Sequence, residues 1–179
     1  MATSIRKSAA KKSSKTSRSA GVAKPKARAR VNPIPDQYAG INAVLRIDGA
    51  ARAIDYYAQV FGARVRMRLD MPDGRVGHAE LKIGKALFML ADEYPEMSIL
   101  GPKSVGGASV ALQLYVRDCD EILRRGERAG GKIIRPAKDE FYGDRSGMLE
   151  DPFGHHWMIQ THIEDVSPAI MKKRLKALG

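Results

Sequence analysis

Histidine, aspartate and the single tryptophan meet in one short stretch, DPFGHHWMIQ, which runs from Asp151 to Gln160. Imidazole and carboxylate groups could bind a metal or move protons, because histidine titrates near neutral pH. Neighbouring residues of a strand point to opposite faces, however. If the stretch is a turn followed by a strand, His155 and His156 cannot chelate one ion together, and His156 alone is expected to face a binding cleft.

A second candidate is the pair His78 and Glu80, an H-x-E sequence within a strand-like run. Residues two apart share one face of a strand, with Cβ atoms about 7 Å from each other. One interpretation is a general base with a carboxylate that orients it. The other is a polar strand edge that contacts only water.

Three further side chains each have two interpretations. Tyr115 either donates a hydrogen bond to a ligand or belongs to the core. Arg145 either binds an anion or pairs with a neighbouring acid such as Asp144 or Glu150. Cys119 is the only cysteine, so it cannot form an internal disulfide, and we interpret it as a packing residue because no nucleophile motif surrounds it.

The elements that must position these groups occur twice along the chain. The segment Val44–Val65 predicts a strand, a turn and a helix that ends at Gly62, and Gly84 then separates two strand-like runs. The segment Ser109–Ile134 again predicts a strand and a helix, and two strands follow in SGMLEDPFGHHWMIQTH. Ordered structure of this kind is expected to begin near Gln37.

The two copies align with nearly constant offsets. Ile47 matches Val116 with an offset of 69, and IGKALFML matches FGHHWMIQ with an offset of 70. We therefore predict an α+β fold of two paired β-α-β-β-β modules, at about residues 37–95 and 107–166, with a cleft between them. The modules could pair within one chain or between chains.

Basic residues are concentrated before this repeat. Residues 1–35 hold ten Lys or Arg and no acid, whereas the remainder holds 21 basic and 20 acidic residues. Residues 1–36 are predicted to be a disordered tail, because they have few large apolar side chains. The tail is a solvated extension, an arm that contacts nucleic acid weakly and non-specifically, or a transit peptide.

The C-terminal residues 167–179 predict a helix, with Ser167 as N-cap, Pro168 in the first turn and an apolar stripe that packs on the body or on a partner subunit. No apolar run is long enough to span a bilayer, and no secretory signal is evident, so we expect a cytoplasmic protein without membrane contact.

Together, these residues resemble the vicinal oxygen chelate superfamily, which includes glyoxalases, bleomycin-resistance proteins and extradiol dioxygenases. The resemblance rests on DGAARAIDYYAQVFGA in the first module and on VRDCDEILRRGERAGGKII and DPFGHHWMI in the second. The string YGDRSGMLEDPFGHHWMIQTHIEDVSP is most similar to the PhnB-like branch. The resemblance implies the paired-module fold over about residues 38–167.

Enzymes of this superfamily hold one divalent metal in the cleft, with ligands from the first and last strands of each module. The resemblance places these ligand positions at Asn42, Phe88, Ala111 and Met158. Phenyl and methyl groups offer no donor, a thioether is soft, and an amide oxygen is a weak neutral ligand. We therefore expect neither a metal nor another cofactor.

Strand alternation divides the side chains into two sets. The set expected to pack beneath the helices is Leu45, Leu81, Leu87, Met89, Leu114, Leu149, Trp157 and Ile159. The set expected to face the cleft is Asn42, Val44, Arg46, His78, Glu80, Phe88, Leu90, Ala111, Gln113, Tyr115, Ser146, Met148, His156, Met158 and Gln160. An apolar floor with a few polar groups suits a small organic ligand.

Three functions remain open. The first is a metal-independent protein that binds a small organic molecule in the cleft of a homodimer, as the resemblance implies for members of this kind. The second is a lyase or isomerase of the glyoxalase type, in which His78, Glu80 or Tyr115 performs acid–base chemistry, with or without an atypical metal. The third is a regulatory protein that the basic tail holds on nucleic acid.

Overall fold

The computed structural model describes residues 31–177. Most of the predicted tail, residues 1–30, lies outside the described residues. The body, from Ile34 onward, forms one compact unit, and its first element is the short 3-10 helix η1 (Asp36–Tyr38). This first described element follows Pro33 and Pro35 directly.

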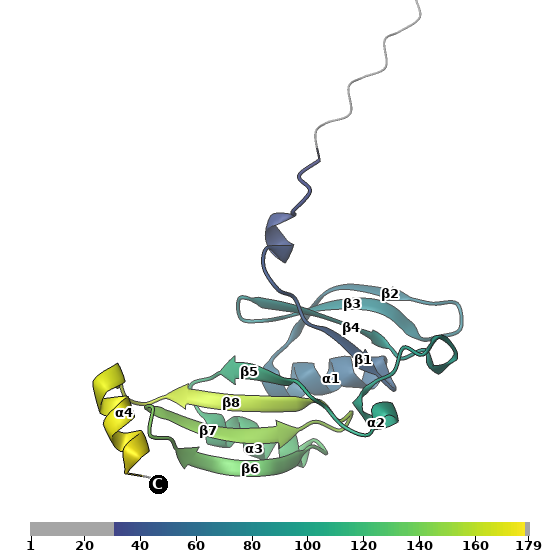
Figure 1. Cartoon of the computed structure of the whole chain (residues 1–179). Helices are drawn as coiled ribbons and strands as arrows, with labels where there is room; N and C mark the ends of the chain where they lie inside the picture. The colour runs from purple at the N-terminus through teal and green to yellow at the C-terminus, as the bar shows by residue number, and fades with distance from the viewer. Residues whose placement is uncertain (1–30, 178–179) are drawn as a thin grey trace, which may run out of the picture. The chain divides into compact units, whose positions relative to one another are not determined.

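The first module has the predicted order of elements (Figure 1). It consists of β1 (Val44–Ile47), α1 (Ala50–Phe61), β2 (Arg64–Asp70), β3 (Val76–Ile83) and β4 (Ala86–Asp92). The strand order in its sheet is β1-β4-β3-β2, with β1 and β4 parallel and the other pairs antiparallel. This sheet is called sheet 1 below.

The second module repeats this connectivity. It consists of β5 (Ala111–Tyr115), α3 (Cys119–Arg128), β6 (Lys132–Asp139), β7 (Asp144–Glu150) and β8 (His156–His162). Its sheet, called sheet 2 below, has the order β5-β8-β7-β6 with the same pattern of parallel and antiparallel pairs. The prediction of an α+β fold built from two β-α-β-β-β modules is confirmed.

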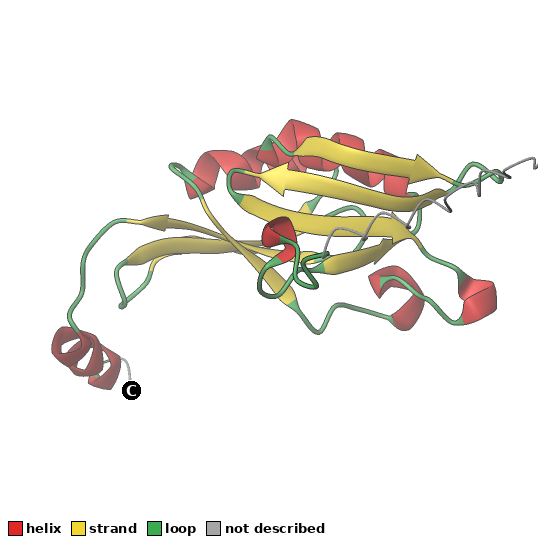
Figure 2. Cartoon of the chain, turned by 90° about the horizontal axis from the view of Figure 1, so that it is seen from above, coloured by secondary structure: helices red, strands yellow, loops and turns green. Residues whose placement is uncertain are grey.

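The connection between the modules contains η2 (Pro95–Met97) and α2 (Pro102–Val105), and α4 (Pro168–Lys176) ends the chain. The predicted cap of α4 is present, since the Ser167 hydroxyl accepts a hydrogen bond from the Ile170 N–H. None of the α4 residues is buried, and the helix lies apart from both sheets (Figure 2). Within residues 31–177, no helix has the length and apolar character that crossing a bilayer requires.

Helix α1 is held in place by a buried carboxylate from the last strand of its module. Asp92 accepts hydrogen bonds from the N–H groups of Gly49 (3.0 Å) and Ala50 (2.9 Å) at the start of the helix, and from the N–H of Val76 (2.6 Å). A carboxylate at this end also complements the helix dipole. The helix ends at Gly62, whose φ of 67° is in the left-handed region that glycine tolerates best.

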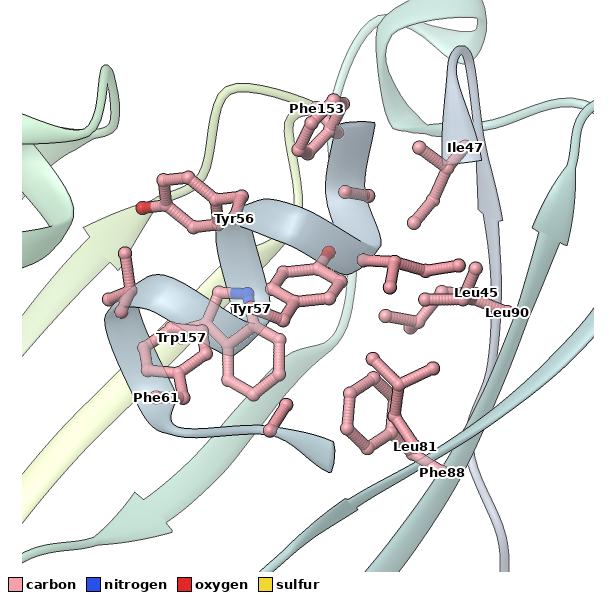
Figure 3. Packing of buried hydrophobic residues seen from close by; sticks show 14 of the residues in the cluster. Leu45, Ile47, Tyr56, Tyr57, Phe61, Leu81, Phe88, Leu90, Phe153 and Trp157 are labelled. Atoms are coloured by element: carbon pink, nitrogen blue, oxygen red, sulfur yellow. The ribbon is translucent and has the colours of Figure 1, made fainter. Parts of the chain in front are cut away.

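The two modules share one hydrophobic core around α1 (Figure 3). Tyr57 of this helix lies 5.8 Å from Phe88 of sheet 1 and 5.3 Å from Trp157 of sheet 2, measured between ring centroids. Its hydroxyl donates a 2.7 Å hydrogen bond to Asp151, which also accepts one from the Trp157 indole N–H at 2.9 Å. The face of sheet 2 that bears α3 therefore packs against the helix of the first module.

The strand register corrects one predicted offset. Leu45 is the parallel partner of Leu90, and Leu114 is the partner of Ile159, so the first and last strands of the two modules both match with an offset of 69. The predicted offset of 70 for the last strands is wrong by one residue. A shift of one residue exchanges the two faces of a strand.

Candidate functional site

Each sheet has one helix-bearing face and one open face, and the candidate residues are divided between the two open faces. Since both helix-bearing faces contribute to the shared core, the open faces point away from that core and from each other. Figure 1 shows α1 between the two sheets. The predicted cleft residues therefore form two groups, one on sheet 1 and one on sheet 2.

The open face of sheet 1 is largely apolar. Strand pairing places Val44, Met89, Glu80 and Met67 in one row across the sheet. Val44, Met67 and the nearby Leu69 are exposed to solvent, at 51%, 38% and 55%. Contiguous exposed apolar side chains of this kind mark a binding surface more often than a solvated face.

Glu80 forms the polar centre of this face. Its side chain is buried, and it accepts a 2.5 Å hydrogen bond from the Tyr38 hydroxyl and a charge-assisted hydrogen bond from Arg66. The Nε2 of His78 lies 3.5 Å from Glu80 Oε1, the oxygen that also accepts the hydrogen bond from Tyr38. The hydrogen bond from Tyr38, together with Arg66, holds the pKa of Glu80 below its usual range despite the burial.

This geometry limits the chemistry of the His78–Glu80 pair. Glu80 is an ionised acceptor whose oxygens are already occupied, so it is an orienting group rather than a proton donor. His78 remains partly exposed, at 33% of its side chain, and is the group of the cluster that could exchange a proton with a ligand. The structure brings His78 and Glu80 together as predicted, but Tyr115 lies on the other sheet.

The open face of sheet 2 has an equivalent row of Gln113, Met158, Met148 and Arg135. Near the C-terminal end of β5, the side chains of this face carry amide and hydroxyl groups. The side-chain amide of Gln113 donates to Gln160.

Tyr115 anchors a buried carboxylate on the same face. Its hydroxyl donates a 2.6 Å hydrogen bond to Asp144, and this bond raises the pKa of Tyr115. Asp144 also lies 2.7 Å from Nδ1 of His162, whose Nε2 lies 2.9 Å from Asp165. These two carboxylates raise the pKa of His162. Tyr115 is 55% exposed, so it is a surface residue of the open face and not part of the core.

Two predicted orientations on β4 are wrong. Phe88 and Leu90, expected in the cleft, are buried beneath α1, where Phe88 packs edge-on against Tyr57 and Trp157. Leu87 and Met89, expected beneath the helices, occupy the open face instead. The reason is the offset of 69: Phe88 is the counterpart of Trp157, and Met89 is the counterpart of Met158.

Of the two interpretations of Arg145, the structure shows pairing with acids, although with other partners than expected. It donates to Asp120 of α3 at 2.6 and 2.9 Å and to Asp139 of β6 at 2.8 Å. The partners expected from the sequence, Asp144 and Glu150, do not bind it. Two carboxylates already neutralise this guanidinium, so it is not available to an anion in the cleft.

The positions that the resemblance assigned to metal ligands now read Asn42, Met89, Ala111 and Met158. The amide nitrogen of Asn42 donates to the Tyr38 carbonyl at 2.9 Å, and the other three offer two thioethers and a methyl group. This donor set does not fit a divalent cation, which prefers carboxylate, imidazole or thiolate ligands. Among residues 31–177, no three His, Cys, Asp or Glu side chains gather as a metal site would require.

The stretch DPFGHHWMIQ is divided between the core, the turn and the open face. Asp151 accepts hydrogen bonds from the N–H groups of Phe153 and His155, both at 2.9 Å, and this closes the turn. His155 lies at the junction of the modules, where its Nε2 donates to the Arg46 carbonyl at 3.2 Å, and burial lowers its pKa. His156 lies on the open face, 3.3 Å from Glu150.

The sequence patterns missed three residues of the sheet 1 face. Tyr38 lies just after the proline-rich segment, and Arg66 and Met67 belong to β2, a strand whose residues are all exposed. The sequence of this strand, RVRMRLD, alternates arginine with apolar residues, and this pattern is the signal that could have located it.

Comparison with known proteins agrees with this architecture. The model of the Glyoxalase/Bleomycin resistance protein/Dioxygenase superfamily matches residues 39–159. The chain belongs to this superfamily. An uncharacterised protein of Mycobacterium tuberculosis is 38% identical over 138 residues, which cover 75% of this chain and 81% of that protein.

Two other superfamily relatives are more distant. A lactoylglutathione lyase of Neisseria meningitidis is 26% identical over 116 residues, covering 64% of this chain and 84% of the lyase. A crystal structure of a Pseudomonas aeruginosa protein superposes with a TM-score of 0.55 at 26% identity, covering 69% of this chain and 98% of that protein. The superfamily is thereby established, and the activity is not.

Proposed function

We propose that this superfamily member binds a small organic molecule, without the usual divalent metal, in a cleft between two copies of the chain. The open face of sheet 1 from one copy and the open face of sheet 2 from the other form the two walls. The observation that carries this proposal is that both faces hold the cleft-type residues, while the shared core turns them away from each other within one chain.

The composition of the two walls supports a ligand of this kind. Met67 and Met89 flank Glu80 on one wall, and Met148 and Met158 are direct cross-strand neighbours on the other. Methionine is flexible and polarisable, so such walls adapt to apolar ligands. Glu80 with its partners and the amides of sheet 2 would orient the polar groups of the ligand.

A complementation experiment tests the shared cleft. Met89→Arg disables sheet 1 and Met158→Arg disables sheet 2, so neither variant alone should bind a ligand found by thermal-shift screening of the wild type. In a mixed dimer of the two variants, one cleft carries both substitutions and the other carries neither. In an equal mixture that exchanges subunits freely, half of the dimers are mixed, so about a quarter of the wild-type ligand binding should return.

If the cleft forms within one chain, every mixture of the two variants should fail to bind the ligand. Such a failure would refute the shared cleft. Sedimentation of the wild type at several concentrations must show a dimer. Met97→Ala serves as the control, because Met97 is an exposed methionine (65%) that lies in η2, outside both strand rows.

A second candidate function is a lyase or isomerase of the glyoxalase type. The 3.5 Å approach of His78 to the buried Glu80 favours it, since this carboxylate can orient the imidazole as a general base. Turnover of hemithioacetal substrates, measured with and without a chelator, tests it. Activity that persists in chelator and disappears in His78→Gln would establish this alternative, and inactivity of the wild type under both conditions would remove it.

We further propose a place in the PhnB-like branch and in the cytoplasm. The support for the branch is the string YGDRSGMLEDPFGHHWMIQTH, which spans β7, β8 and the turn between them.

A further inference from the structure

A groove lies where the two modules meet, next to the open face of sheet 1, and Val44 borders both. It is bounded by β1 on one side and β5 on the other, which are the edge strands of their sheets. The segment from Leu100 to Val110, which includes α2, covers it. The groove has a volume of about 370 Å³, within the range typical of small-molecule sites. One chain completes it, whereas the proposed cleft needs two.

The walls of the groove are held by specific polar contacts. Glu93 accepts hydrogen bonds from the Gly101 N–H (2.8 Å) and the Ser104 hydroxyl (2.8 and 2.9 Å), which fix the covering segment. A side chain at Gly101 would place its Cβ 2.6 Å from the Arg46 carbonyl oxygen, so only glycine allows this close approach. His155 binds the same carbonyl from the second module. The groove is therefore preformed.

The lining of the groove is mainly apolar and carries one charge. Its apolar side chains include Val44, Leu100, Val105 and Val110, which are 51%, 37%, 62% and 70% exposed. Arg46 also lines it, and none of its described lining residues is acidic. Among residues 31–177, no carboxylate lies within 4.0 Å of the Arg46 guanidinium, in contrast to Arg66, Arg75, Arg145 and Arg174.

We infer that this groove is a second ligand site, which takes a small carboxylic acid with an apolar body. The guanidinium of Arg46 would bind the carboxylate through two parallel hydrogen bonds, the geometry in which arginine recognises this group best. The apolar body would cover the exposed valine and leucine side chains. Glu93, which binds the covering segment, does not compete, because its oxygens are occupied by Gly101 and Ser104.

The test uses the full chain and the matched pair 4-phenylbutyrate and 4-phenylbutyramide, which differ in charge but hardly in shape. Amide NMR signals of residues 100–110 and His155 should shift on titration with the acid. Affinity for the acid should exceed affinity for the amide by about tenfold, the effect of a charge-assisted bidentate contact. Equal binding of acid and amide would overturn the assignment of Arg46.

Two variants distinguish binding in the groove from non-specific binding elsewhere on the protein surface. Arg46→Gln should reduce the affinity for the acid to that for the amide, whereas Arg64→Gln, which changes an exposed arginine of β2, should leave it unchanged. Val110→Asp places a negative charge at an exposed wall position and should abolish binding of the acid without unfolding the protein. Acid binding that survives both Arg46→Gln and Val110→Asp would refute the site.

The outcome is independent of the proposed cleft. Met158→Arg changes the open face of sheet 2 and should leave 4-phenylbutyrate binding intact, because Met158 does not line the groove. Loss of acid binding in this variant would instead assign the acid to the cleft.

Discussion

The side chains of Phe88 and Trp157 meet edge to face in the core shared by the two modules, with ring centroids 6.0 Å apart. Phe88 belongs to the last strand of the first module and Trp157 to the last strand of the second. The contact therefore joins the modules and leaves the next residue of each strand, Met89 and Met158, on an open face.

The first prediction follows from this contact. Phe88→Ala should lower the free energy of unfolding by about 3–5 kcal/mol, because a buried aromatic side chain leaves a cavity when truncated. Met89→Ala should cost roughly 1 kcal/mol, because Met89 is only partly buried and faces the open side. Urea denaturation of both variants measures the difference. A larger loss in Met89→Ala than in Phe88→Ala would mean that β4 has the reverse orientation.

The second prediction concerns the pH dependence that Glu80 contributes. Its pKa is lowered in the folded state by the hydrogen bond from Tyr38 and by Arg66. Its stabilisation is therefore present above the unfolded pKa of about 4.3 and is lost as the pH falls through the folded value. The melting temperature of the wild type should exceed that of Glu80→Gln at pH 7, and the gap should close below about pH 4.

Glu127→Gln is the control for this experiment, because Glu127 is an exposed residue of α3. Its melting temperature should follow the wild type at every pH. A gap between wild type and Glu80→Gln that stays constant down to pH 3 would contradict the ionised cluster.

The third prediction concerns His162, which lies between Asp144 and Asp165. Both of its ring nitrogens face a carboxylate, so the structure favours the imidazolium and raises the pKa of His162. A raised histidine pKa stabilises the fold fully below the unfolded value of about 6.5, and this contribution disappears as the pH rises through the folded value.

NMR titration of the imidazole measures this shift directly. The pKa of His162 should lie above about 6.5 in the wild type. It should fall in Asp144→Asn and in Asp165→Asn. Asp139→Asn is the control, since Asp139 binds Arg145 instead. A wild-type pKa at or below the ordinary value would show that the two carboxylates do not enclose the ring in solution.

The fourth prediction concerns the basic N-terminal segment, which lies outside the described residues. Its ten Lys and Arg precede a body that is close to neutral. We propose that it contacts nucleic acid weakly and without sequence preference, so DNA retention by the full chain should fall steeply between low and physiological salt. A chain that starts at Gln37 should not be retained. Equal retention of both chains would exclude the segment as the contact.

The sequence determined the fold to a large extent, and for identifiable reasons. The helix α1 and the strands β1, β3, β4, β7 and β8 carry apolar side chains at helical or alternating spacing, because each buries one face. Glycine ends α1, and Ser167 caps α4, as their types require. The edge strands β2 and β6 were not located, although β2 alternates arginine with apolar residues.

The candidate site was decided partly by the sequence and partly by the tertiary structure. The types of the residues were enough to show that the usual ligand positions lack metal donors, and this conclusion survives the change from Phe88 to Met89. The turns before β4 and β8 differ in length. An alignment of the two sequences without gaps therefore gave the wrong register, and with it the wrong orientation of β4. Only the packing of α1 against Trp157 shows which of Phe88 and Met89 is buried.

Tertiary structure alone decided what surrounds each charge. Strand spacing predicted that His78 and Glu80 share a face, but Tyr38 and Arg66, which keep Glu80 ionised, come from η1 and an edge strand that are distant in sequence. Arg145 binds acids on α3 and β6 instead of its sequence neighbours. Local periodicity specifies which face a side chain takes, whereas its partners across the molecule depend on how the elements pack.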